Sequence, residues 1–169
     1  MAELLRTHPL ESRAPALAEA GITVEPYVAM VNVRGTSVLQ PNTWVTVNDG
    51  REIWLGPDER LLTNATEAPW EYEARIRAEL AAGEDVVTDV SAQRIQLHLT
   101  GEHARDVLAK GCAIDLHPTV FPAGSAAQTR LGQAGVILLS LTEGYLVIVR
   151  SSFAGYLADW LLDAVDEFR

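Results

Sequence analysis

The chain has 169 residues, of which 48% are hydrophobic, and it carries a formal net charge of -10 at pH 7. This length supports one domain with a hydrophobic core, and the hydrophobic content excludes a disordered chain. The acidic balance, without any run of Lys and Arg, argues against a protein that binds nucleic acid or an anionic membrane surface.

Residues 1–20 mix apolar, charged and proline residues without a period, so we expect an N-terminal arm that is extended or loosely held. The single domain is predicted to span residues 21–169. No apolar run is long enough to cross a bilayer, and residues 1–20 lack the apolar stretch of a secretory signal. Because Cys112 is the one cysteine, no internal disulfide can form, and we expect a cytoplasmic protein.

The first part of the predicted domain is rich in β-forming residues. Residues 22–33 form a β-rich block, and residues 44–47 form a short strand between turn residues. Residues 53–55 and 60–62 are predicted to be strands that are joined by a tight turn over 56–59.

The middle of the chain combines helices with one predicted strand. A helix is expected over residues 66–82, ended by Gly83. Residues 86–99 follow as one strand with a bulge near Ser91, and residues 100–109 form a short helix.

The last part of the chain reads as a hairpin followed by a helix. Residues 136–141 and 145–149 are joined by Thr142-Glu143-Gly144, a hairpin turn with Gly at the left-handed position. Both strands are apolar on both faces, so each face is expected to be covered by helices or by another chain. The final helix is predicted to begin at an N-cap, Ser151 or Ser152. The order of elements indicates an α+β fold in which a mixed or antiparallel sheet is packed with helices.

The residues that could carry chemistry do not form a recognisable set. Cys112, Asp115 and His117 lie within six residues, but a zinc site needs three or four ligands with paired spacing. We therefore expect a buried Cys112, a His117 that bonds backbone groups before Pro118, and an Asp115 that caps a turn. No glycine-rich phosphate or dinucleotide motif is present. No catalytic, cofactor-binding or metal residue is assigned. The tryptophans are predicted to pack in the core or at an interface, and Trp160→Ala to be among the most damaging single changes.

Ordered sequence blocks cover most of the chain after residue 30. The blocks are Trp54-Leu55-Gly56-Pro57-Asp58-Glu59 with Leu61-Leu62, Val87-Thr88-Asp89-Val90-Ser91, Lys110-Gly111-Cys112 with Asp115-Leu116-His117-Pro118, Phe121, Gly124, Ala127-Gln128-Thr129, and Arg150-Ser151 with Phe153-Ala154, Tyr156-Leu157 and Trp160-Leu161. In their order and spacing, which are together specific, the blocks resemble the sarcosine oxidase gamma subunit family, which belongs to heterotetrameric sarcosine oxidases.

The resemblance implies a non-catalytic subunit that braces a flavin-bearing large subunit. It implies the alpha, beta and delta subunits as partners, and oxidative demethylation of sarcosine to glycine, with folate as one-carbon acceptor, on the large subunits. FAD, FMN, NAD and tetrahydrofolate would belong to the partners, and no cofactor is expected on this chain. The implied fold is similar to the folate-binding domain of aminomethyltransferase-type proteins.

The densest group of polar residues in a predicted loop between apolar elements is the candidate partner interface, as partner-facing or loop-fixing residues. It consists of Lys110, Cys112, Asp115, His117, Gln128 and Thr129. One alternative is a stand-alone folate-binding or aminomethyltransferase-like protein, with the tryptophans and Asp115 around a one-carbon carrier. Another is the gamma subunit of a related N-methyl amino acid dehydrogenase.

Overall fold

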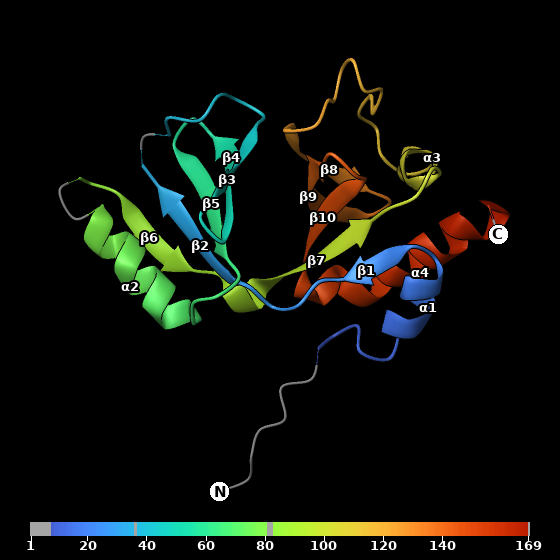
Figure 1. Cartoon of the computed structure of the whole chain (residues 1–169), viewed down its shortest axis with the longest axis horizontal. Helices are drawn as coiled ribbons and strands as arrows, with labels where there is room; N and C mark the ends of the chain where they lie inside the picture. Colours follow the sequence, from blue (N-terminus) through green and yellow to red (C-terminus); the bar gives the residue numbers. More distant parts are fainter. Residues whose placement is uncertain (1–7, 36, 81–82, 169) are drawn as a thin grey trace, which may run out of the picture.

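Two antiparallel sheets face each other in the computed structural model, which describes residues 8–35, 37–80 and 83–168 (Figure 1). Within these residues each sheet has five strands. Sheet A has the order β1-β7-β10-β9-β8 and sheet B the order β3-β4-β5-β2-β6. The strands of sheet A are β1 (Ile22–Val24), β7 (Arg94–Leu99), β8 (Ala126–Leu131), β9 (Ala134–Ser140) and β10 (Tyr145–Arg150). Those of sheet B are β2 (Ala29–Arg34), β3 (Trp44–Val47), β4 (Gly50–Gly56), β5 (Glu59–Asn64) and β6 (Val86–Asp89).

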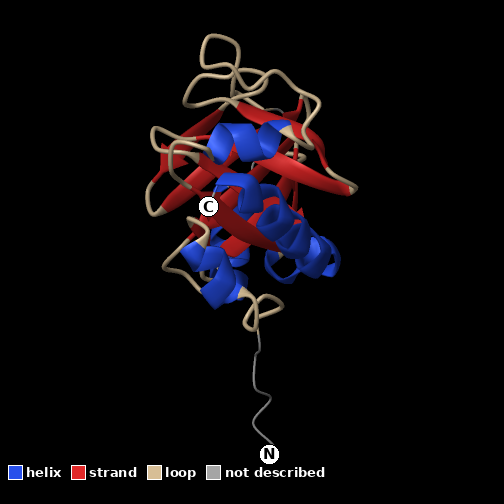
Figure 2. Ribbon diagram, turned by 90° about the vertical axis from the view of Figure 1, so that its right-hand side faces the viewer, coloured by secondary structure: helices blue, strands red, loops and turns tan. Residues whose placement is uncertain are grey.

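Helices cover the outer face of each sheet. In sheet B, α2 (Pro69–Glu79) buries Tyr72 and Ile76 against Val31 and Val33. On the outer face of sheet A, α1 (Ala14–Glu19), α3 (Ala104–Ala109) and α4 (Ala154–Val165) share one core cluster with its strands. The long loop between α3 and β8 projects from the side of the molecule opposite to α1 and α4 (Figure 1) and is among the loops at the top of Figure 2. None of the described helices has the length and apolar run needed to cross a lipid bilayer.

The position of β9 and β10 between the helices and sheet B explains why both strands are apolar on both faces. Because successive side chains point to opposite faces of a strand, Leu138 and Val147 pack toward the helices. Ile137 and Ile148 pack toward sheet B, in a second core cluster that contains residues of both sheets. The prediction of a hairpin with two covered faces is confirmed, and the second face is covered by the chain's own other sheet.

The prediction of one continuous strand over residues 86–99 is wrong. The chain leaves sheet B after Asp89 and enters sheet A at Arg94, through a 3₁₀ turn over Ser91–Gln93. The Asp89 Oδ1 accepts the backbone N–H of Ser91 at 2.9 Å, and the Ser91 Oγ accepts the N–H of Met30 at 2.8 Å. These side-chain bonds compete with a strand ladder, so they set the corner between the sheets.

The described part of the predicted arm is not loosely held. Leu10 and Leu17 are fully buried, the latter on α1. The Arg13 guanidinium donates to both carboxylate oxygens of Asp159 on α4, at 2.7 and 2.9 Å. Residues 8–20 therefore pack on sheet A and α4, because their two leucines complete that core, while residues 1–7 lie outside the described residues.

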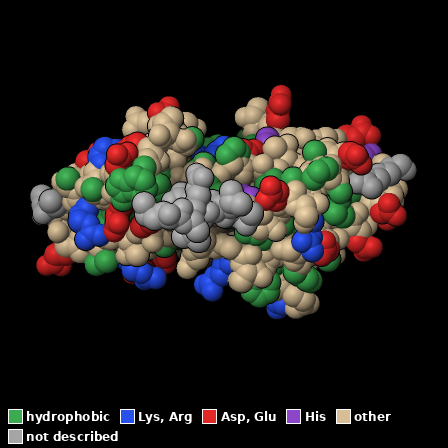
Figure 3. Space-filling model, turned by 90° about the horizontal axis from the view of Figure 1, so that it is seen from below, with side chains coloured by type: hydrophobic (Ala, Val, Ile, Leu, Met, Phe, Trp, Pro, Cys, Tyr) green, Lys and Arg blue, Asp and Glu red, His purple; other side chains and the backbone are tan. Residues whose placement is uncertain are grey.

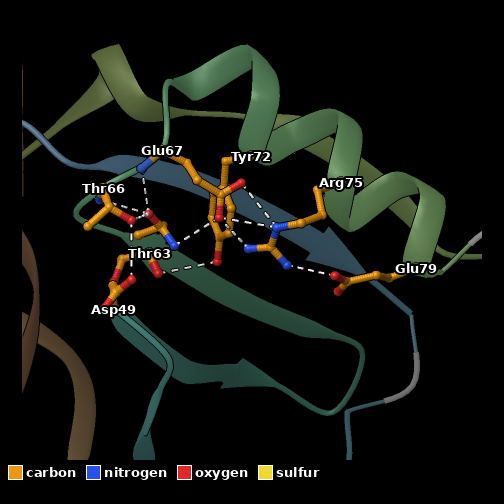
Figure 4. A network of polar contacts seen from close by, with 8 residues as sticks. Asp49, Thr63, Thr66, Glu67, Tyr72, Arg75 and Glu79 are labelled. Atoms are coloured by element: carbon orange, nitrogen blue, oxygen red, sulfur yellow. Dashed lines mark hydrogen bonds and ion pairs between the residues drawn. The ribbon is translucent and has the colours of Figure 1, made fainter.

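Helix α2 begins later than predicted, after a polar turn. The Asn64 Oδ1 accepts the backbone N–H groups of Thr66 and Glu67 at 2.8 and 2.7 Å. Glu67 in turn pairs with Arg75 of α2, which also pairs with Glu79, each at 2.6 Å (Figure 4). This network fixes the start of α2 to the end of β5.

One further expectation differs from the structure. Neither Ser151 nor Ser152 caps α4, which begins at Ala154 after a 3₁₀ turn over Ser151–Phe153. Instead the Ser151 hydroxyl donates to the Ala92 carbonyl at 2.8 Å. The side chain of Trp70 is 65% exposed and lies outside the core, so for this tryptophan the predicted interface stays a prediction.

Candidate partner interface

The six predicted interface residues do not form one surface. Cys112 and Thr129 lie on the helix-covered side of sheet A, with Sγ 3.9 Å from Oγ1. The backbone of Cys112 forms an antiparallel bridge to Leu131 at the end of β8. Cys112 is half-buried, as a small apolar side chain at the sheet's margin would be.

Lys110 holds the C-terminal end of α4. Its Nζ donates to the Ala164 carbonyl, pairs with Glu167 at 2.9 Å and lies 4.7 Å from the centre of the Phe168 ring. A cation at the C-terminus of a helix is favoured by the helix dipole and by the unpaired last carbonyls. These contacts give Lys110 an intramolecular role.

Asp115 and His117 lie in the projecting loop and are exposed. The Asp115 Oδ1 accepts the backbone N–H of His117 at 2.9 Å, which confirms the predicted turn cap. The His117 Nδ1 contacts the Thr119 Oγ1 at 2.8 Å and the Thr119 backbone N at 3.3 Å, as predicted for a histidine that bonds backbone groups. Among the described residues no three His, Cys, Asp or Glu side chains are placed to hold a metal ion.

Gln128 and Thr129 are on strand β8, so the expectation that they lie in a loop is wrong. The strand was missed because its side chains are small or polar. Gln128 points to the face opposite Thr129, and its Nε2 donates to the Leu55 carbonyl at 2.6 Å. Leu55 sits at a register shift in β4, which leaves its carbonyl outside the ladder. A partner contact by any of the six residues stays a prediction.

A groove on the inner face of sheet A is the more notable surface feature. It has a volume of about 580 Å³, and we call it the arginine groove. Its charged residues are Arg94, Arg130 and Arg150, and its apolar floor includes Ile137 and Ile148. Arg94 on β7 and Arg150 on β10 are directly opposite each other in the antiparallel register. Like charges in that position repel.

The surroundings of Arg94 change its pKa. Burial, followed by the neighbouring charge of Arg150, lowers the pKa of Arg94, and Glu59 offsets this in part. Arg94 and Arg150 also border a second hollow of about 270 Å³, which Glu59 and Arg34 line from sheet B. Glu59 is already engaged, because its carboxylate accepts Asn32 Nδ2 at 2.8 Å and pairs with Arg34 at 3.1 Å.

Sequence reasoning missed the arginine groove. Arg150 appeared only as part of a resemblance block, and Arg94 was placed inside a continuous strand. The signal in the sequence was an arginine at one end of each of two strands, but only the pairing of β7 with β10 makes them neighbours. On the face seen in Figure 3, acidic and basic side chains are interspersed over much of the surface, without a large patch of Lys and Arg.

Comparison with known proteins extends these observations. Residues 20–167 match the family described as "Sarcosine oxidase, gamma subunit family". The chain belongs to this family. The resemblance carried by the sequence blocks is thereby confirmed.

Gamma subunits from two Corynebacterium strains are among the relatives. "Sarcosine oxidase subunit gamma" of strain P-1 is 37% identical over 157 residues, which cover 90% of this chain and 70% of that protein. The protein of the same name from strain U-96 is 38% identical over 117 residues, which cover 69% of this chain and 56% of the relative.

Two solved structures have a similar fold. A chain of the heterotetrameric sarcosine oxidase from Corynebacterium sp. U-96, in complex with pyrrole 2-carboxylate, is 27% identical with a TM-score of 0.87. The match covers 97% of this chain and 96% of that one. The glycine cleavage system aminomethyltransferase T from Bartonella henselae is 15% identical, with a TM-score of 0.66 over 89% of this chain and 48% of that one. The predicted α+β fold, similar to aminomethyltransferase-type proteins, is confirmed.

Proposed function

We propose that this chain is a non-catalytic subunit of a heterotetrameric sarcosine oxidase and that it braces a flavin-bearing large subunit. The observation that carries the proposal is the match over nearly the full length of both chains to a chain of that enzyme, with a TM-score of 0.87. The alpha, beta and delta subunits would be its partners, in the cytoplasm. FAD, FMN, NAD and tetrahydrofolate would be bound by those partners and would serve the oxidative demethylation of sarcosine to glycine.

The projecting loop and the arginine groove are the surfaces that support a bracing role. Lys110, Cys112, Gln128 and Thr129 are engaged with neighbouring groups of the same chain, while Asp115 and His117 remain exposed in the projecting loop. The arginine groove is built from side chains of several strands, and none of the described residues that line it is acidic. These features fit a surface that recognises another subunit.

Co-expression with the candidate alpha, beta and delta subunits tests the proposal. The tagged full chain should recover a yellow complex that oxidises sarcosine, and the chain alone should be colourless and inactive. Omitting the chain should reduce recovery of the assembled large subunits. Full assembly and full activity of the other subunits without this chain would contradict a bracing role.

Two further measurements separate the alternatives. Titration of the isolated chain with tetrahydrofolate should leave its tryptophan fluorescence unchanged, and saturable quenching would favour a stand-alone folate-binding protein. The assembled complex should oxidise sarcosine faster than other N-methyl amino acids. The reverse preference would indicate the subunit of a related dehydrogenase.

A further inference from the structure

We infer that the arginine groove is the docking site for an acidic segment of a partner subunit, whose carboxylates lie between Arg94 and Arg150. The inference rests on the proposed function and names a chemical class of partner surface for it.

Among the described residues, the positive charge of the groove is compensated only in part, by Glu59 near Arg94. Arg94, Arg130 and Arg150 line it, no described acidic residue does, and the chain as a whole carries a net charge of -10. The carboxylate of Glu59, which borders the second hollow on the side of sheet B, is already held by Asn32 and Arg34. Facing arginines in neighbouring strands are unfavourable in isolation, and a carboxylate between them would turn repulsion into two charge-assisted hydrogen bonds.

The shape of the groove suits a peptide segment. Its floor combines Ile137 and Ile148 with the ring of Phe153, which is 42% exposed. Gly135 also lines it, and a side chain built there would have no atom within 4 Å, so the backbone of β9 is open to close approach. Arginine and aromatic residues around an apolar floor are typical of the centre of a protein–protein interface. Sites for small molecules are usually cavities that enclose the ligand, and the described residues of the groove do not form such a cavity.

The first test replaces one arginine by a neutral polar residue. In Arg150→Gln, affinity for the partner subunits should fall by at least about 30-fold, because the carboxylate loses a charged partner. The thermal midpoint of the isolated full chain should rise by about 1–3 °C, because the repulsion of Arg94 is relieved. Arg105→Gln is the matched control, since Arg105 is exposed on α3 outside the groove, and it should leave affinity unchanged. A fall of the midpoint in Arg150→Gln would show that Arg150 is structural and would overturn the inference.

The second test fills the groove. Gly135→Phe adds a side chain whose Cβ meets no atom within 4 Å, at a residue without a left-handed backbone, so the chain should fold with an unchanged midpoint and fail to assemble. Replacement of Phe153 by photo-reactive p-benzoylphenylalanine should cross-link the complex to a partner peptide that contains Asp or Glu. Cross-links to a partner peptide without acidic residues, or only within this chain, would overturn the inference.

The outcomes separate the two proposals. If the wild-type chain does not assemble with the candidate subunits, the proposed function fails and the inference falls with it. If the wild type assembles and both Arg150→Gln and Gly135→Phe assemble equally well, the inference alone fails. Saturable binding of inorganic phosphate by the isolated chain, together with normal assembly of Arg150→Gln, would assign the groove to a small anion instead.

Discussion

Gln128 is a side chain that joins the two sheets. Its amide reaches from β8 to the carbonyl of Leu55, which the register shift in β4 leaves without a ladder partner. We expect Gln128→Met, which keeps the length of the side chain and removes the donor, to lower the free energy of unfolding by about 1 kcal/mol. Urea unfolding measures this. Gln40→Met at an exposed position is the control, and an equal effect of both substitutions would contradict a specific role for Gln128.

Tyr72 makes stability depend on pH in the alkaline range. Burial raises the pKa of Tyr72 to about 12, which the nearby charge of Arg75 opposes in part, and its hydroxyl donates to the Thr63 carbonyl at 3.2 Å (Figure 4). The folded chain therefore keeps this proton while the unfolded chain releases it above about pH 10. Stability that is present below about pH 10 should be lost as the pH rises toward about 12.

The measurement compares urea unfolding of the wild type and Tyr72→Phe at pH 9 and pH 11. The wild type should lose as much as about 1 kcal/mol more than the variant between these two values. Equal losses would show that Tyr72 ionises normally in the folded state. The pKa of Tyr145 is also raised by burial, and its contribution should remain in both proteins.

At the scale of elements, two glycines allow the Trp160 ring of α4 to pack closely beside sheet A. A Cβ at Gly111 would lie 2.4 Å from the ring of Trp160, and Gly132 has a φ of +57° beside the same ring. Trp160 is half-buried, whereas Leu157 and Leu161 are fully buried. We therefore expect Leu161→Ala to cost about 2–5 kcal/mol and to exceed Trp160→Ala, against the ranking that the sequence suggested.

The close approach of the Trp160 ring to Gly111 leads to a prediction for Gly111. Gly111→Ala should lower the free energy of unfolding by about 1–3 kcal/mol, because the added methyl group overlaps the ring. Gly135→Ala is the control, since a Cβ there meets open space, and it should be within about 0.5 kcal/mol of the wild type. Chemical denaturation compares the two. A neutral Gly111→Ala would mean that α4 can shift freely on the sheet.

At the scale of the whole molecule, the two sheets are bound into one unit. Their shared core contains Met30 and Leu61 from sheet B with Leu139 and Leu146 from sheet A. The corner at Ser91 ties the sheets together, since its Oγ accepts the buried N–H of Met30. This arrangement favours a single cooperative unfolding transition.

Ser91→Ala tests the corner. It should lower the free energy of unfolding by about 1–3 kcal/mol, because the Met30 N–H loses its acceptor in a buried place. Ser152→Ala, at an exposed position, should be nearly neutral. Circular dichroism and tryptophan fluorescence should report one coincident transition for the wild type. Two separate transitions would show that the sheets unfold independently.

The sequence by itself determined the elements whose residue patterns are local. Strand 44–47 was predicted at its observed bounds, and the hairpin of β9 and β10 within two residues, because turn residues and apolar runs act over short distances. The turn at Asp115 and His117 was likewise predictable from side chains that bond their own backbone. The sequence blocks also identified the family, which the match over residues 20–167 confirmed.

Only the tertiary structure decided what brings distant residues together. The division of residues 86–99 between two sheets depends on the contact of Ser91 with Met30, and the polar strand β8 is held by its pairing with β9. The facing arginines of the groove are more than 50 positions apart in the chain and become neighbours through one register. Such contacts depend on how whole sheets pair and pack, and the residue pattern of one strand does not specify which strand will be its neighbour.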